Sequence, residues 1–98
     1  MVLELAILNV KPGQGNQFEA NFKLASPLIA SIKGYVTHSL NRCIEDPNKY
    51  ALLVTWETLE DHTIGFRTSP QYAQWKELLH HFYDPFPVVE HFNGVNLT

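Results

Sequence analysis

The histidines are the first candidates for chemistry in this chain of 98 residues. Imidazole changes its charge near neutral pH, so a histidine in a pocket can act as a general base. His62 is the first choice for that role, because it falls on a short predicted helix that would lie over a sheet; the alternative is a helix-surface or capping-turn histidine. His38 is predicted on a strand face, where it would point into a pocket or form hydrogen bonds at an interface with a partner sheet.

Other polar and aromatic side chains could complete such a site. The Asn9 amide, at the end of a strand, could hold an oxyanion or could bond to its own turn. The Tyr72 hydroxyl could donate to a substrate oxygen, and Arg67 could steady an anion unless it only meets solvent. Aromatic residues that could wall a pocket, or simply fill the core, are Trp56, Phe66, Tyr72 and Trp75.

The remaining histidines and the single cysteine do not form a metal-binding pattern. His80 and His81 are adjacent and would point to different sides of a helix, without a second ligand one turn away. His91 alternates with Glu90 on the last predicted strand, so one of the two faces inward or toward a partner. Cys43 excludes an internal disulfide and a cysteine-based zinc site, and we expect it to serve in packing.

The elements that would position these residues follow from hydrophobic periodicity and from turn residues. Four strands are predicted, at residues 2–10, 35–43, 50–56 and 88–92. Apolar residues at three- and four-residue steps predict a helix over 16–32, where Pro27 indicates a kink or a fresh start at Ser26.

Two further helices have explicit start signals. Thr58 and Asp61 have the spacing of a capping box, which predicts a short helix ending near Phe66. Ser69 followed by Pro70 predicts an N-cap and first helical residue. The helix that follows, ending before residue 84, aligns on one face Tyr72, Trp75, Leu79 and Phe82.

The resulting order, β-α-β-β-α-α-β, predicts one α+β domain over residues 1–98. It is the ferredoxin-like arrangement, a four-stranded antiparallel sheet with helices on one face. The strands at 2–10 and 50–56 are apolar on both sides, so the second face of the sheet also needs cover. An identical sheet related by a two-fold axis is the simplest cover, which predicts a homodimer.

Composition excludes several classes of function. Charged residues make up 17% of the chain, below the roughly 25% of typical soluble domains, which also favours a partner or ligand that hides apolar surface. The net charge of −3 and the scattered Lys and Arg residues argue against nucleic acid as a partner. The start lacks a cationic segment and a long apolar run, so we expect a soluble cytoplasmic protein.

Several short motifs follow one another over nearly the whole chain: Leu3 to Gly13, Gly34-Tyr35, Tyr50 to Glu57, Thr58 to His62, Phe66 and Ser69 to Tyr72. In the order and spacing of these motifs, the chain resembles the antibiotic-biosynthesis monooxygenase (ABM) family of dimeric α+β barrel proteins. This resemblance implies two sheets facing each other across a dimer, and a pocket in each protomer between the sheet and its helices. The haem-degrading type is not expected, because the positions of its asparagine, tryptophan and histidine are here Ala6, Phe66 and Lys76.

The resemblance implies an oxidoreductase that works without a cofactor. In such a monooxygenase or quinol oxidase the electron-rich aromatic substrate loses a proton and passes electrons to dioxygen. The protein then supplies a base, an oxyanion donor and a dry aromatic pocket. The candidates are His62, Asn9 and Tyr72 for chemistry, and for substrate binding His38, Trp56, Phe66, Arg67 and Trp75.

Two alternatives to catalysis stay open at this point. The same pocket could serve only to bind a small ligand, as a non-catalytic or stress-response dimer module. The aromatic side chains could also fill the pocket and leave only a dimerisation unit.

Overall fold

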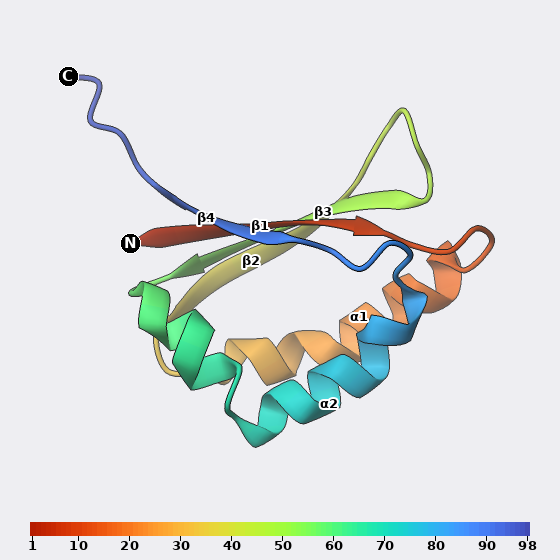
Figure 1. Ribbon diagram of the computed structural model, residues 1–98, viewed down its shortest axis with the longest axis horizontal. Helices are drawn as coiled ribbons and strands as arrows, with labels where there is room; N and C mark the ends of the chain where they lie inside the picture. The colour runs from red at the N-terminus through yellow and green to blue at the C-terminus, as the bar shows by residue number, and fades with distance from the viewer.

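A computed structural model, which describes all residues from Met1 to Thr98, has the predicted α+β architecture (Figure 1). The strands are β1 (Val2–Asn9), β2 (Tyr35–Arg42), β3 (Lys49–Trp56) and β4 (Val89–Asn93). They form one antiparallel sheet in the order β2-β3-β1-β4, so the ferredoxin-like prediction is confirmed. Figure 1 shows the helices on one side of this sheet: α1 (Gly15–Ala30), η1 (Asp61–Phe66), α2 (Pro70–Leu79) and η2 (His80–Phe82).

Helix α1 is a single helix that continues through Pro27, so the fresh start considered at Ser26 does not occur. The Ser26 hydroxyl instead donates to the carbonyl of Phe22 at 3.0 Å, one turn back within the helix. Proline removes one backbone donor, but burial of the apolar face before and after it holds the helix together. That face consists of Phe18, Phe22, Ala25 and Ile29.

The two predicted helix starts form as expected. The Thr58 hydroxyl accepts from the Asp61 amide and the Asp61 carboxylate accepts from the Thr58 amide, both at 3.2 Å, which completes the capping box. The Ser69 hydroxyl caps α2 by accepting from the Tyr72 amide at 3.1 Å. The short helix η1 between them is π-helical, a wide turn in which the Arg67 amide donates to the carbonyl of His62.

The core lies between the helices and the sheet face that they cover. The even-numbered residues of β1 and β3 point to this face, and all of them except Val2 are buried. In β2 a bulge between Tyr35 and Thr37 shifts the alternation, so that Tyr35 and His38 both point to the helices. Strict alternation along the strand would put Tyr35 on the same face as Thr37, and the residues themselves carry no signal for the bulge.

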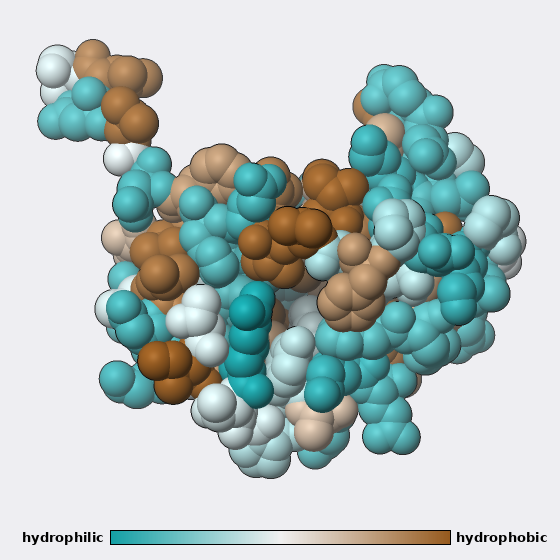
Figure 2. Space-filling model, in the orientation of Figure 1, coloured by the Kyte–Doolittle hydropathy of each residue, from teal (hydrophilic) through white to brown (hydrophobic).

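The opposite face of the sheet has no layer over it. Several large apolar side chains there are more than a third exposed, namely Leu3 at 38%, Ile7 at 36% and Phe92 at 45%. Figure 2 shows hydrophobic side chains at the surface over the sheet of Figure 1. No helix combines the length and the apolar character that crossing a membrane would require.

Candidate active site

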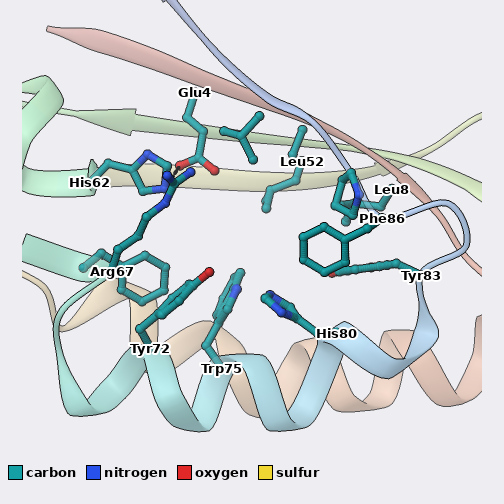
Figure 3. Close-up of a pocket in the computed structure, with 14 residues that line it drawn as sticks. Glu4, Leu8, Leu52, His62, Arg67, Tyr72, Trp75, His80, Tyr83 and Phe86 are labelled. Carbon is teal, nitrogen blue, oxygen red and sulfur yellow. Dashed lines mark ion pairs between the residues drawn. The ribbon is translucent and has the colours of Figure 1, made fainter. Parts of the chain in front are cut away.

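A cavity of about 440 Å³ lies between the helix side of the sheet and the segments η1, α2 and the loop that follows η2 (Figure 3). One end of this cavity is polar and is formed by Glu4, His62 and Arg67. The rest is mostly apolar and aromatic, with Leu8 and Leu52 contributed by the sheet. The combination is typical of a site for a flat, largely apolar molecule with one polar end.

Glu4 is a buried carboxyl group at the sheet end of the cavity. Its place in the middle of β1, on the same face as Ala6 and Leu8, leaves it only 4% exposed. The Trp56 indole donates to Glu4 Oε1 at 2.9 Å, and His62 Nε2 lies 3.4 Å from the same oxygen. The second oxygen, Oε2, has no hydrogen-bond partner, and Figure 3 shows the carboxyl group directed toward the cavity.

Burial raises the pKa of Glu4, although the Trp56 hydrogen bond and the positive charge of Arg67 both oppose this shift. A carboxylate in a site with little water is a stronger base than one in solution, because its charge is poorly solvated. Glu4 is therefore suited to take a proton from a ligand in the cavity.

His62 lies beside Glu4 and is itself buried. Its ring stacks on Trp56, with ring centroids 5.4 Å apart and an interplanar angle of 18°. Its Nδ1 is 2.8 Å from Nε2 of His91, so both ring nitrogens have neighbours. Burial, together with the charges of Arg67 and His91, lowers the pKa of His62 to about 3, so the ring is neutral at neutral pH.

The aromatic walls come from η1, α2, η2 and the loop after η2. Phe66 packs edge-on against Tyr72 and Trp75, with centroid distances of 5.0 and 5.5 Å. At the far end His80 packs against Phe86 at 4.9 Å, and Tyr83 lies next to both. Burial raises the pKa of Tyr83, so its hydroxyl stays protonated and is able to donate a hydrogen bond.

The comparisons with known proteins agree with this fold. A sequence model of the antibiotic biosynthesis monooxygenase (ABM) family matches residues 1–78. The chain belongs to the ABM family. The YczJ protein of Bacillus subtilis (strain 168), which is uncharacterized, is 58% identical over 95 residues, covering 97% of this chain and all of YczJ.

Solved ABM structures extend the likeness to three dimensions. A structure from Bordetella bronchiseptica, assigned to antibiotic biosynthesis monooxygenases, is 35% identical, covers 97% of each chain and has a TM-score of 0.92. SnoaB from Streptomyces nogalater, a cofactor-independent oxygenase, has a TM-score of 0.78 at 21% identity, with 97% of this chain and 93% of SnoaB covered. At that identity the likeness to SnoaB concerns the fold alone.

The ABM fold brings together five of the eight site residues proposed from the sequence. These five line the cavity: His62, Phe66, Arg67, Tyr72 and Trp75. Trp56 lies one layer behind them, where it holds Glu4 and supports His62.

The other two residues proposed from the sequence lie away from the cavity of this ABM protein. Asn9 ends β1, paired with Lys49, and shares the uncovered sheet face with Ile7. His38 lies under α1, where its ring nitrogens contact the Tyr35 hydroxyl at 2.6 Å and the Ser26 hydroxyl at 3.2 Å.

Several cavity residues were absent from the prediction, and Glu4 is the most important. Its sequence signal was an acidic residue at an inward-facing position of an otherwise apolar strand, where a buried charge needs partners. The cavity is also lined by His80, Tyr83 and Phe86, which lie in η2 and in the loop after it. In such segments no periodicity predicts where a side chain points. The ABM chain contains no group of three or more His, Cys, Asp or Glu side chains placed to hold a metal ion.

Proposed function

We propose that this ABM protein is a monooxygenase or quinol oxidase that acts on an electron-rich phenolic aromatic molecule without metal, flavin or haem. The observation that carries the proposal is the buried Glu4, which has a free carboxyl oxygen directed into an aromatic cavity. A group of this kind can remove a phenolic or benzylic proton, which is the step that makes such a substrate reactive toward dioxygen.

The base assigned here differs from the one predicted from the sequence. His62 has both ring nitrogens engaged by Glu4 and His91, so it has no nitrogen left to face a substrate. Glu4 does have a free acceptor atom, the carboxyl oxygen Oε2, which has no hydrogen-bond partner. We therefore assign the base to Glu4 and give His62 the task of holding it.

Arg67 supports the same chemistry from the neighbouring wall. Figure 3 shows its side chain extending to the polar end of the cavity, beside His62 and Glu4. A guanidinium at this place would stabilise the phenolate or enolate that forms when Glu4 takes the proton. Tyr72, which lines the wall next to Phe66, would donate a hydrogen bond to a substrate oxygen, as its sequence position suggested.

The overall reactions balance with dioxygen as the only co-reactant. A hydroxyanthrone CH₂ group would become C=O, with one oxygen atom entering the product and the other leaving as water. A quinol would lose two protons and two electrons and give a quinone and hydrogen peroxide. SnoaB, a cofactor-independent oxygenase, supports the proposal to the extent that its fold is compatible with such chemistry.

We also propose that the working unit is a homodimer joined through the uncovered sheet faces. The support is the apolar strip on that face, in which Leu5 and Leu53 are register partners at the centre and Leu3, Ile7 and Phe92 are more than a third exposed. An apolar surface of this kind is stabilised when a second copy removes it from water.

The second candidate function is non-catalytic binding of a small aromatic ligand. An apolar cavity without a polar group would favour it, whereas the buried Glu4 favours catalysis because a buried carboxyl is costly unless it has a use. The open cavity of about 440 Å³ argues against a third function, in which the domain only dimerises, because side chains would then fill that space.

The test is oxygen consumption with a panel of quinols and hydroxyanthrones, for the wild type and for Glu4→Gln. The matched control is Glu77→Gln, which removes an exposed carboxylate on α2 outside the cavity. We expect Glu4→Gln to reduce kcat by about 10²- to 10⁴-fold, the usual contribution of a positioned base, and the control to retain the wild-type rate. Wild-type ligand binding without oxygen consumption would instead favour the binding module, and an unchanged rate in Glu4→Gln would remove Glu4 from the mechanism.

A further inference from the structure

Three titratable side chains form a continuous row from the cavity to the outside of the molecule. Glu4 lines the cavity, and His62 Nε2 is 3.4 Å from its Oε1. His62 Nδ1 is in turn 2.8 Å from Nε2 of His91, which is half-buried on β4 directly across from Glu4 in the β1–β4 register.

The far end of this row does not open into the cavity. His91 is not among the cavity-lining residues; it lines a separate surface depression of about 250 Å³ together with Leu59 and Phe92. Only His62 therefore connects the cavity carboxyl to a side chain with access to solvent on another surface.

We propose that His62 and His91 are a proton relay that exchanges the Glu4 proton with solvent while the cavity is occupied. The inference rests on the proposed function, because Glu4 must lose the proton that it takes from each substrate before the next turnover. A bound aromatic molecule would block the direct route for water from the cavity to Glu4. The relay gives the proton a second route to solvent, through the side of Glu4 that faces away from the cavity.

The proton movements balance with both rings neutral before and after. Glu4 takes the substrate proton on its cavity-facing oxygen, and the carboxyl group then turns about its Cγ–Cδ bond so that this O–H faces His62 Nε2. The O–H gives its proton to His62 Nε2, His62 Nδ1–H gives its proton to His91 Nε2, and His91 Nδ1–H gives its proton to a buffer base or water. Glu4 ends as a carboxylate, and each ring has changed from the Nδ1–H to the Nε2–H tautomer. The 3.4 Å contact is longer than a usual hydrogen bond and has to shorten by a few tenths of an ångström for transfer.

The surrounding charges favour this neutral relay over a route through imidazolium. Arg67 is the cation that faces the row, and it helps to lower the pKa of both His62 and His91. Asp61, next to His62, is held by the Thr58 capping box, and Glu90 pairs with Leu5 on the other face of the sheet. Glu4 is therefore the single acidic group that faces the two rings.

The tautomers of the two rings can be measured without any enzymatic assay. We would titrate ¹⁵N-histidine-labelled, ¹³C-glutamate-labelled protein and follow Glu4 by its carboxyl carbon and the rings by two-bond ¹H–¹⁵N spectra. The expected result is that His62 and His91 change tautomer together, over the same pH range in which Glu4 loses its proton. The Glu4→Gln variant should lose this joint change, and His81→Gln, which replaces an exposed histidine outside the row, should retain it.

The second arm uses turnover and chemical rescue. We expect His91→Gln to reduce kcat by roughly tenfold to hundredfold, with little change in KM. This loss is at or below the smallest effects that a positioned acid or base usually has on the rate. Added imidazole should restore the rate of His91→Gln and leave the wild type unchanged, whereas a merely structural defect would not respond to imidazole.

The outcomes separate the relay from the proposed function. Rings that keep fixed tautomers while Glu4 titrates would overturn the relay, as would a His91→Gln variant with wild-type turnover. A joint tautomer change without oxygen consumption on any substrate would support the relay and reject the oxygenase proposal.

Discussion

Acidification should destabilise the protein through His62 by an amount that the structure allows us to work out. Burial, with the charges of Arg67 and His91, lowers the pKa of His62 from its ordinary 6.5 to about 3 in the folded state. Between these two values the unfolded chain binds a proton at this residue and the folded chain does not. The free energy of unfolding therefore falls as the pH falls through this window, and it is unaffected by His62 above pH 7.

The magnitude follows from the width of the window. One pKa unit corresponds to about 1.4 kcal/mol, so lowering the pH from 8 to 5 should cost about 2 kcal/mol through His62, and the loss should approach about 5 kcal/mol near pH 3. Glu4 acts in the opposite direction, because its raised pKa lets the folded state bind a proton more readily as the pH falls. The two effects have to be separated by a variant.

The assay is urea unfolding of the wild type and of His62→Gln at pH 8 and pH 5. We expect the stability difference between the two proteins to change by about 2 kcal/mol in favour of the variant at the lower pH. His81→Gln, which replaces an exposed histidine, serves as the control and should behave as the wild type does at both pH values. A difference between wild type and His62→Gln that is the same at pH 8 and pH 5 would refute the assignment of a neutral, desolvated His62.

Two further predictions concern the turn before β2 and the uncovered sheet face. Gly34→Ala should lower the free energy of unfolding by about 2–3 kcal/mol in urea melts, because Gly34 has φ +87° and an added Cβ would clash with the Asp61 carboxylate of the capping box. Gly94→Ala, at a glycine with open space around it, is the control and should change little. Leu53→Asp, at the centre of the uncovered face, should convert the proposed dimer to a folded monomer in analytical ultracentrifugation. A wild type that is already a stable single subunit at micromolar concentration would contradict the dimer proposal.

The fold was predictable from the sequence because local signals and global packing agree. The alternation in β1 and β3, the three- and four-residue steps of α1, and the capping signals at Thr58 and Ser69 each specify one element, and all of them form. The exceptions are local. Packing on both sides of Pro27 overrides its tendency to break α1, and the bulge after Tyr35 has no signature in the residues themselves.

The site was predictable only in part, because the type of a residue does not specify the direction in which its side chain points. His62, Tyr72 and Trp75 were found because helical periodicity fixed the face on which they lie. Asn9 was grouped with them for its amide, although its position in the β1 alternation puts it on the uncovered face. The sequence does not single out Glu4, because one acidic residue in a strand is usually solvated, and only the assembled sheet shows that helices cover it.

The π-helical form of η1 makes the spacing of this segment unusually strict. Each helical residue turns the chain by a fixed angle, about 100° in an α-helix and somewhat less in this wider turn. Deleting one residue from Asp61–Phe66 would therefore rotate Phe66 and Arg67 relative to His62 by most of a quarter turn. The cavity would then lose either its cation or its histidine, even though every residue type was retained. Chains of this family that differ in length between the capping box and Ser69 are therefore expected to have a different arrangement of groups at the polar end of the cavity, and so a different chemistry.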